Sequence, residues 1–389
     1  MLRSAKLQEG FQLNDYSDYL SEDEESEFGS LTYPIFQTSA FIMPKGLKFR
    51  YTRENNPTVA NLARKVSLLE HAESTTCFAS GMGAVTTTLL TLLKPGSKLL
   101  IQRDVFSRSY TFSRDFLAKW GVRTSFALPG TENTLSLLKD KPDVIFVESI
   151  TNPILRVNDI KLMGEEIHNI GGILVVDSTL STPHNIKPID LGADIVIHSA
   201  SKFMSGHNNV IAGTCSGKNE LVEKIDLMRR TLGPSLDPFS AFLVDNGIKT
   251  LGIRMERINN SAMHIATELN KIKQIDSVIY PGLNDHPDHS IASKFMHGYS
   301  GVIAFRVNKS ISDPEKVFRY MKLVKPANTL GGPNTVISHP VTMSHRSLND
   351  DEKRLIGIDT HIFRLSIGLE NPDDILNDIK NSLSKVTSV

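Results

Sequence analysis

The chain is poor in cysteine and has no surplus charge. Its only two cysteines among 389 residues are Cys77 and Cys215. They stand far apart among small or apolar residues, which argues against a disulfide framework and suits a reducing compartment. The 43 basic and 43 acidic side chains cancel, so nothing points to nucleic acid or an anionic membrane. We therefore expect a cytoplasmic protein without a nucleic-acid partner.

Long apolar runs are also missing. No stretch approaches the ~20 apolar residues that a membrane-spanning helix needs, and we expect no membrane association. The first twenty residues lack the uninterrupted apolar core of a signal peptide. The overlapping segment 14–27 is crowded with acidic residues and serine, which is typical of a solvated N-terminal arm.

From about residue 75, short apolar runs alternate with longer amphipathic stretches such as 106–119 and 159–170. The runs are 76–78, 99–101, 144–147, 173–176 and 195–197. This alternation predicts an α/β domain with a mainly parallel sheet. In such sheets the ligand lies outside the carboxyl ends of the strands. We therefore expect one crevice to be lined by the polar residues that end the runs, namely Ser80, Gln102, Glu148, Asp177 and Ser199.

Beyond about residue 218 the pattern becomes less regular. One long helical pattern covers about 239–272, and alternating runs follow at 301–305 and 362–367. This indicates a smaller C-terminal α+β domain, and the chain length itself favours two or more domains. The predicted parts are an N-terminal arm (1–60), an α/β domain (61–245) and an α+β domain (246–389).

Two glycines follow the first apolar run, in FASGMGA at 78–84. Glycines let backbone N–H groups approach a ligand, and a helix that begins there directs its positive end to the same place. A phosphate site is one interpretation, and a tight turn that requires glycine is the other. GMGAVT at 81–86 also nearly matches a dinucleotide fingerprint, with Asp104 placed to bind a ribose. A nicotinamide-dependent oxidoreductase is therefore an alternative.

Two other motifs do not carry their usual chemistry. Residues 213–219 have one residue too few between the glycines for a Walker-type phosphate loop, and Asn219 stands where Ser or Thr must bind magnesium. His286 and His289 in HPDH could touch one metal ion, but no further ligand is evident. We expect no metal site.

Asp177 and Lys202 each lie close behind an apolar run, so both should emerge at the same edge of the sheet. A lysine becomes a nucleophile only where its site disfavours the charged form. Pyridoxal phosphate needs such a lysine, an acid for the pyridine nitrogen and a phosphate site. Each residue alone has an ordinary explanation, a solvated loop lysine or a helix-capping aspartate. Their occurrence together, with Ser199 and Ser201 beside the lysine, favours pyridoxal phosphate.

The sequence around this lysine resembles a known family. The stretch 175–213 reads VVDSTLSTPHNIKPIDLGADIVIHSASKFMSGHNNVIAG. It is similar to the signature of the Cys/Met-metabolism family of pyridoxal-phosphate enzymes, which includes cystathionine γ-synthase, cystathionine β- and γ-lyases, methionine γ-lyase and O-acylhomoserine sulfhydrylases. Further similar motifs are RYTRENNPT at 50–58, FASGMGA at 78–84, ESITNP at 148–153, LGGPN at 330–334 and FRLSIGLE at 363–370.

The resemblance implies an α/β fold of the PLP-dependent transferase type I, with a mainly parallel seven-stranded sheet and the cofactor on the domain 61–245. It implies that Lys202 forms a Schiff base with the cofactor and moves protons, and that Asp177 keeps the pyridine nitrogen protonated. Arg364 would clamp the substrate α-carboxylate in a bidentate pair. Phosphate ligands would be Gly81, Met82, Ser199 and Ser201. Tyr51 and Arg53 would reach in from a neighbouring subunit of a homo-oligomer, expected to be a dimer of dimers, while Asn152 contacts the cofactor ring.

Two positions depart from the family pattern. Phe106 stands where relatives usually carry a tyrosine; it can stack on the cofactor but has no hydroxyl for proton transfer. A hydroxyl from Tyr110, or the charge of Arg108, could take over that task. At Thr329 relatives commonly have serine, and the residue before it helps to select the substrate. Asn328 is neither the acid of cystathionine or cysteine lyases nor the apolar residue of methionine γ-lyases, so the substrate stays open.

The resemblance implies γ-replacement or γ-elimination on a small homoserine-derived or sulfur amino acid, of the cystathionine γ-synthase or γ-lyase type. Methionine γ-lyase and O-acetylhomoserine sulfhydrylase activities are the alternatives. Because Phe106 lacks a hydroxyl, a protein that binds the cofactor with little catalysis is a further one.

Overall fold

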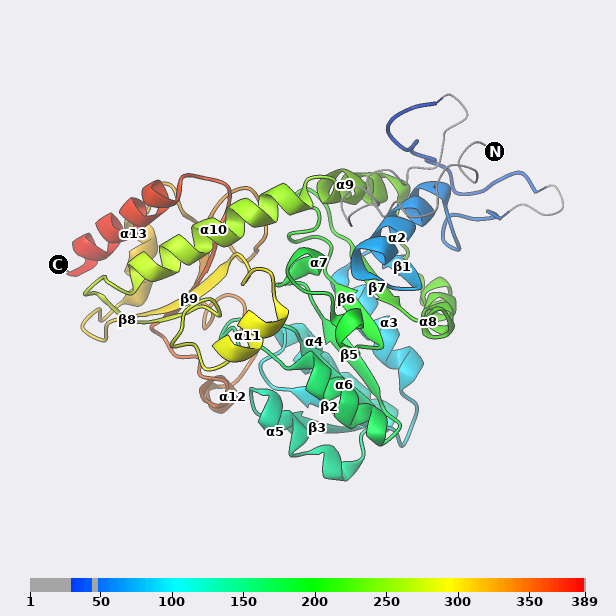
Figure 1. Cartoon of the computed structure of the whole chain (residues 1–389), viewed down its shortest axis with the longest axis horizontal. Coiled ribbons are helices and arrows are strands. Elements are labelled where there is room, and N and C mark those ends of the chain that lie inside the picture. Colours follow the sequence, from blue (N-terminus) through cyan, green and yellow to red (C-terminus); the bar gives the residue numbers. More distant parts are fainter. Residues whose placement is uncertain (1–28, 44–47, 388–389) are drawn as a thin grey trace.

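The computed structural model describes residues 29–43 and 48–387. The predicted acidic arm at 14–27 lies outside these residues. The chain has two sheets, a larger one in the N-terminal part and a smaller one in the C-terminal part, and the long helix α10 (Leu251–Leu269) runs along the smaller part (Figure 1).

The larger sheet has seven strands in the order β1-β7-β6-β5-β4-β2-β3. Their bounds are β1 Ser74–Phe78, β2 Lys98–Gln102, β3 Arg123–Ala127, β4 Val144–Glu148, β5 Ile173–Asp177, β6 Ile195–His198 and β7 Gly213–Gly217. Only β7 runs opposite to the other strands of this sheet, and it pairs antiparallel with β1 and β6. The mainly parallel sheet is therefore confirmed. The strands β3 and β7 were not predicted, because RTSFA and GTCSG lack an apolar run.

Helices cover both faces of this sheet, because the strands are apolar on both sides. Phe146 and Ile197 pack with Val85 and Leu89 of α3 (Gly81–Leu92), and α8 (Asn219–Leu232) belongs to the same core. On the other face, the alternate strand residues, Val147 among them, pack with α6 (Ile160–Asn169). The helix α2 (Pro57–Glu70) packs beside β1. Three short helices lie in loops: α4 Ser107–Thr111, α5 Thr131–Leu135 and α7 Thr182–Asn185.

Two predicted long helices are wrong in extent. The pattern at 239–272 forms two helices, α9 (Pro238–Ile248) and α10, which are separated at residues 249–250. At Gly247 an added Cβ would lie 2.3 Å from the Ser205 carbonyl oxygen, so this end of α9 presses against the turn after Lys202. The stretch 106–119 forms α4 followed by a π-turn and a 3-10 turn.

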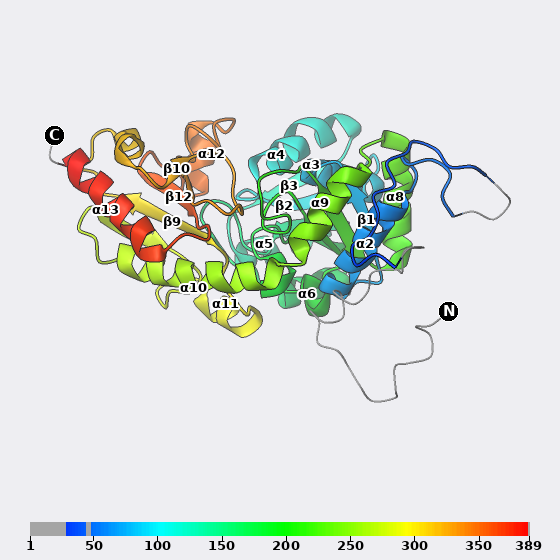
Figure 2. The ribbon, with the colours of Figure 1, turned by 90° about the horizontal axis from the view of Figure 1, so that it is seen from above.

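The smaller sheet has five strands in the order β10-β11-β12-β9-β8. Their bounds are β8 Ile275–Ile279, β9 Val302–Val307, β10 Lys325–Pro326, β11 Val336–Ser338 and β12 Ile362–Ser366. The remaining helices are α11 His289–Phe295, α12 Asp350–Leu355 and α13 Pro372–Thr387. Figure 2 shows α10 and α13 packed side by side along this part. The smaller C-terminal α+β unit is confirmed; the boundary between 245 and 246 stays a prediction and lies inside α9.

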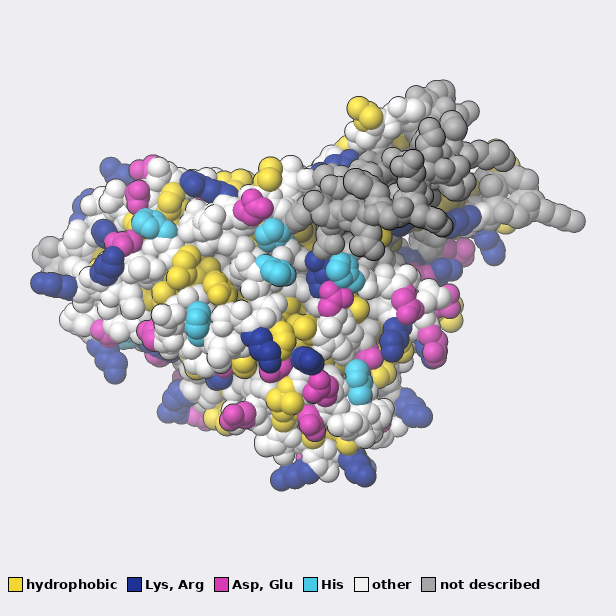
Figure 3. All heavy atoms as spheres, viewed as in Figure 1, with side chains coloured by type: hydrophobic (Ala, Val, Ile, Leu, Met, Phe, Trp, Pro, Cys, Tyr) yellow, Lys and Arg dark blue, Asp and Glu magenta, His cyan; other side chains and the backbone are white. Residues whose placement is uncertain are grey.

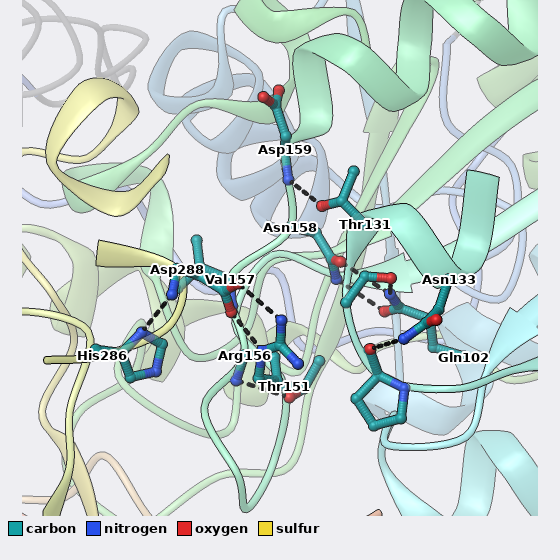
Figure 4. Close-up of polar contacts among 12 residues, drawn as sticks. Gln102, Thr131, Asn133, Thr151, Arg156, Val157, Asn158, Asp159, His286 and Asp288 are labelled. Carbon is teal, nitrogen blue, oxygen red and sulfur yellow. Dashed lines mark hydrogen bonds and ion pairs between the residues drawn. The ribbon is translucent and has the colours of Figure 1, made fainter. Parts of the chain in front are cut away.

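A partly buried ion pair joins the two parts. The Arg156 guanidinium donates to both carboxylate oxygens of Asp288, over 2.6 and 2.8 Å, and the Val157 amide donates to the same carboxylate (Figure 4). Asn158 exchanges hydrogen bonds with Gln102 at the end of β2. The segment after β4 is thus fixed from both sides.

On the face seen in Figure 3, basic and acidic side chains are interspersed, consistent with the balanced charge. Among the residues that the structure describes, no helix is both long and apolar enough to cross a membrane.

Candidate functional site

A cavity of about 330 Å³ lies at the carboxyl ends of the larger sheet, where loops of the C-terminal part close over it. Eleven of the predicted site residues line it: Gly81, Met82, Phe106, Asn152, Asp177, Ser199, Ser201, Lys202, Asn328, Thr329 and Arg364. They come from β5, β12, the start of α3 and the segments that follow β2, β4, β6 and β10. The crevice expected at this edge of the sheet is present and includes Ser80, Glu148, Asp177 and Ser199, whereas Gln102 does not line it and bonds to Asn158 instead.

Lys202 lies in the turn after β6 and points its amine at the loop of the C-terminal part. Its Nζ donates to the Thr329 hydroxyl over 3.3 Å. Burial, and secondly the positive charge of Arg364, lower its pKa to about 8. Gly331 lets the opposite loop approach this closely: its φ is +80°, and an added Cβ would lie 2.5 Å from the Phe203 amide nitrogen. The lysine therefore has a far larger neutral fraction than a solvated one.

Two carboxyl groups lie side by side at the ends of β4 and β5, because Glu148 pairs in register with Asp177. Burial raises the pKa of Asp177, opposed by hydrogen bonds from Thr179 and by the charge of His198. Burial, and secondly the charge of Asp177, raise the pKa of Glu148 well above its ordinary value. Asp177 is thus placed to meet a cationic ring nitrogen, while burial beside it favours the protonated form of Glu148.

Glu148 was predicted to line the crevice as a polar residue that ends a strand, but no role in the site was assigned to it. It lines the cavity, and its Oε1 accepts a hydrogen bond from the Phe106 amide over 2.6 Å. Its Oε2 is buried and has no hydrogen-bond partner among the described residues. The strand-end position was the available signal, but its contact with Phe106 depends on a loop path that the sequence does not reveal.

Arg364 lies on β12 with its side chain 3% exposed. Its Nη1 donates to Asn152 Oδ1 over 3.2 Å and its Nη2 to the Thr329 carbonyl over 3.0 Å. Both acceptors are neutral, and burial lowers the pKa of Arg364 to about 10. A buried guanidinium without a carboxylate partner is suited to bind the carboxylate of a ligand.

The residues around the start of α3 fit a phosphate group. Ser80 caps this twelve-residue helix by accepting from the Gly83 amide, and the helix begins at the cavity wall. At Gly81 an added Cβ would lie 2.7 Å from the Ser199 Cβ, so only glycine allows this approach. Ser201 both donates to and accepts from the backbone of Ala212. The lysine, the acid and this anion site together match what pyridoxal phosphate needs.

Several predicted residues lie elsewhere. Tyr51 and Arg53 do not line the cavity of their own chain; the Arg53 guanidinium donates to the Arg230 carbonyl and lies 5.7 Å from the Tyr51 ring centre. The Tyr110 hydroxyl donates to Glu352 and accepts from Arg103, so it is turned away from the cavity.

The loop that carries HPDH gives its histidines separate structural contacts. His286 Nδ1 accepts from the Asp288 amide, whereas His289 Nδ1 contacts the Pro281 carbonyl. Within residues 29–43 and 48–387, no group of three or more His, Cys, Asp or Glu side chains could hold a metal ion.

Comparison with known proteins agrees with this site. The family model for Cys/Met metabolism PLP-dependent enzymes matches residues 19–384. Cystathionine gamma-synthase 1, chloroplastic, of Nicotiana tabacum is 36% identical over 92% of this chain and 68% of its own length. L-methionine gamma-lyase of Fusobacterium nucleatum is 34% identical over 92% of this chain and 95% of its own length. Cystathionine gamma-lyase of Bacillus subtilis is 32% identical over 94% of this chain and 97% of its own length.

A solved structure shares the whole architecture. Cystathionine gamma synthase from Xanthomonas oryzae pv. oryzae, in complex with aminoacrylate and cysteine, superposes with a TM-score of 0.94 at 28% identity. The match covers 97% of this chain and 100% of that one.

Proposed function

Because the chain belongs to the family of Cys/Met metabolism PLP-dependent enzymes, we propose that it performs γ-replacement or γ-elimination, in the manner of cystathionine γ-synthase or γ-lyase. Pyridoxal phosphate is its cofactor, and its substrate is a small amino acid of sulfur metabolism. Methionine γ-lyase or O-acetylhomoserine sulfhydrylase activity is the alternative, since relatives at similar identity include L-methionine gamma-lyases.

The observation that carries the proposal is the meeting of Lys202, Asp177 and Arg364 in one cavity. Pyridoxal phosphate, when bound, supplies an aldehyde and an electron-accepting ring. Lys202, with its pKa lowered to about 8, would offer a neutral amine to the aldehyde, and, once the substrate's own amine has displaced it, would be free to take a proton from the substrate Cα. Arg364 binds the α-carboxylate, and Asp177 holds the ring nitrogen in its protonated form.

The oxidoreductase alternative finds no support among the relatives. Its ribose ligand would be Asp104, but this side chain is 0% exposed and cannot reach a bound dinucleotide. The glycines at 81 and 83 instead begin a helix that faces Ser199 across the cavity wall.

Reduction and labelling test the central claim. The protein purified with pyridoxal phosphate should be yellow, and borohydride should remove the colour and attach the cofactor to Lys202, as read by peptide mass spectrometry. Lys202→Ala should not become covalently labelled on borohydride treatment and should lose all turnover. A label on another residue would overturn the proposal. Assays with cystathionine, methionine, cysteine and O-acylhomoserines, with and without thiols, then identify the reaction.

The second candidate, a cofactor-binding protein with little catalysis, is favoured by one observation. Phe106 lines the cavity without a hydroxyl, and the Tyr110 hydroxyl is engaged elsewhere. If this hydroxyl limits proton transfer, Phe106→Tyr should raise the rate of γ-elimination by about 10². Steady-state assays of both proteins on the same substrate provide the measurement. An unchanged rate would show that the missing hydroxyl does not limit the enzyme.

Assembly and location are also proposals. We expect a homo-oligomer in which Tyr51 and Arg53 complete the site of a neighbouring copy; their position outside the cavity of their own chain supports this. The side chain of Tyr51 is 44% exposed and available for such a contact. A cytoplasmic location is supported by Cys77 and Cys215, which are buried and unpaired.

A further inference from the structure

The turn that carries Tyr51 and Arg53 is tied to helix α8 by one buried arginine. Arg229 lies in the last turn of α8 and is 5% exposed. Its Nη1 donates to the Arg53 carbonyl over 3.0 Å, and its Nη2 donates to the Glu54 carbonyl over 2.6 Å. Because the guanidinium is planar, two neighbouring carbonyls bound to it are fixed both in place and in direction.

A serine makes a second connection to the same carbonyl. The Arg229 Nη1 also donates to the Ser235 hydroxyl over 2.6 Å, and this hydroxyl donates to the Arg53 carbonyl over 2.7 Å. The backbone of Ser235 forms a bridge with Phe78, the last residue of β1. The turn is therefore held against the larger sheet, next to the point where β1 leads into the anion site at the start of α3.

The arginine is itself oriented by an acid. Asp226 lies three residues earlier on α8, which packs beside β1 (Figure 1). One of its oxygens accepts from the Arg229 Nε over 2.8 Å and from the Thr76 hydroxyl of β1 over 2.7 Å. The other accepts from the Arg230 Nε over 2.6 Å. Asp226 thus compensates the buried charge of Arg229 and leaves both Nη atoms free to hold the turn.

The side chains that leave this turn do not line the cavity of their own chain, and both Tyr51 and Arg53 are exposed. The Arg53 guanidinium donates to the Arg230 carbonyl, and it would have to leave this carbonyl to enter a neighbouring site. The backbone of the turn keeps its place during such a movement, because Arg229 binds the Arg53 carbonyl and not its side chain. A side chain that completes a site across an interface needs such a fixed base, since a displacement of about 1 Å already loosens a site.

We infer that Arg229, oriented by Asp226, is a positioning residue for the cofactor phosphate of a neighbouring copy, because it fixes the backbone from which Tyr51 and Arg53 reach that phosphate. The inference rests on the proposed function, which places these two side chains in the neighbour's site. Loss of Arg229 should therefore weaken cofactor binding in the neighbouring copy, and the copy that carries the substitution should still bind the cofactor.

Mixed oligomers show in which copy the defect appears. Borohydride attaches the cofactor only to chains that keep Lys202, so the label reports only the sites of those chains. In the first mixture, wild-type chains are refolded with an excess of Lys202→Ala/Arg229→Ala chains, which offer them a damaged turn. In the second mixture, Arg229→Ala chains are refolded with an excess of Lys202→Ala chains, whose turn is intact. Peptide mass spectrometry measures the labelling of Lys202 at increasing cofactor concentration.

The cofactor concentration that gives half of the maximal label should rise at least about tenfold in the first mixture and keep its wild-type value in the second. A role of Arg229 confined to the stability of its own chain predicts the opposite pattern. Arg229→Lys keeps the charge but cannot hold two carbonyls in one plane, so in the first mixture its shift should be smaller than that of Arg229→Ala. The matched control is Lys224→Ala, which removes an exposed charge from the same helix and should shift neither mixture.

If Arg229→Ala chains do not fold, both mixtures are made with Ser235→Ala, which removes only the bridging hydroxyl and should give the same pattern. A shift in the second mixture, or no shift in the first, overturns the inference and leaves the proposed function standing. Absence of any label at Lys202 in the wild type overturns the proposed function, and the inference with it.

Discussion

At the scale of single residues, Lys202 has an environment that opposes its charge. It is largely buried, its hydrogen-bond partner Thr329 offers a neutral hydroxyl, and the charge that acts on it is the like charge of Arg364. Such an arrangement stabilises the neutral amine. The same arginine that holds the substrate carboxylate therefore also prepares the nucleophile.

The reaction of the cofactor-free protein with pyridoxal phosphate should follow this titration. Because the neutral amine is the reactive form and its pKa is about 8, the rate should rise with pH through a midpoint near 8. Arg364→Gln removes a charge that lowers this pKa, so the midpoint should move to higher pH. Stopped-flow absorbance measures both. A midpoint near 10.5, the ordinary lysine value, would contradict the role given to burial.

The same titration makes the free energy of unfolding depend on pH. Between pH 8 and 10.5 the unfolded chain holds a proton at Lys202 that the folded chain has lost. The contribution of Lys202 to the free energy of unfolding of the cofactor-free protein therefore rises with pH in this window.

Glu148 should act as a neutral acid that positions Phe106. Glu148→Gln keeps an acceptor for the Phe106 amide and should change cofactor affinity little. Glu148→Ala leaves that amide without its partner and should lower the free energy of unfolding by about 1–3 kcal/mol. Denaturant titration and cofactor titration measure the two effects. If Glu148→Gln lowered stability and cofactor affinity as much as Glu148→Ala, the carboxylate form of Glu148 would be the functional one, and the role as a neutral acid would be wrong.

The pH dependence offers a second check on Glu148. Its pKa is raised by folding, so the folded state holds the proton at pH values where the unfolded state has lost it. The free energy of unfolding should therefore fall as pH rises above 4.5, the ordinary glutamate value, and Glu148→Gln should weaken this fall.

At the scale of elements, α2 and α9 are joined by a buried ion pair. Lys65 Nζ lies 3.0 Å from Asp245, and the two side chains are 0% and 5% exposed. Asp245→Asn would leave the lysine charge buried without its counter-ion, which should lower the free energy of unfolding by about 3–5 kcal/mol. Chemical denaturation provides the measurement. The matched control is Lys224→Ala on α8, which removes an exposed pair and should change stability little.

The sequence predicted the elements whose signal is local. The runs that became β2, β4, β5 and β6 are apolar on both faces, and the residues that end them fall where parallel strands must place them. It did not predict the break between α9 and α10, beside which Gly247 lies against Ser205, a contact with a distant part of the chain that no local pattern reveals. The same holds for the Glu148–Phe106 contact and for the direction of the Tyr110 hydroxyl, which Glu352 fixes from 242 residues away.

At the scale of the whole molecule, the proposed sharing of sites between copies can be tested by complementation. Lys202→Ala lacks the nucleophile of its own site, whereas Arg53→Ala would damage the site of a neighbour. Mixed oligomers of the two variants should contain some sites with neither defect, so activity should return when the two are unfolded and refolded together. If every mixture stayed inactive, Arg53 would act within its own chain.

The hydrogen bond between Ser107 and Ser344 spans 237 residues. It joins an earlier part of the chain, which holds the cofactor, to a later part, which holds the substrate. Everything assigned to the cofactor in the cavity lies between residues 81 and 202, whereas the substrate clamp Arg364 and the loop that meets Lys202 come from the later part. During synthesis Lys202 is therefore made long before Arg364, the residue that helps to lower the pKa of its amine and that clamps the substrate carboxylate. The site can therefore select its substrate only after the smaller sheet has packed against the larger one.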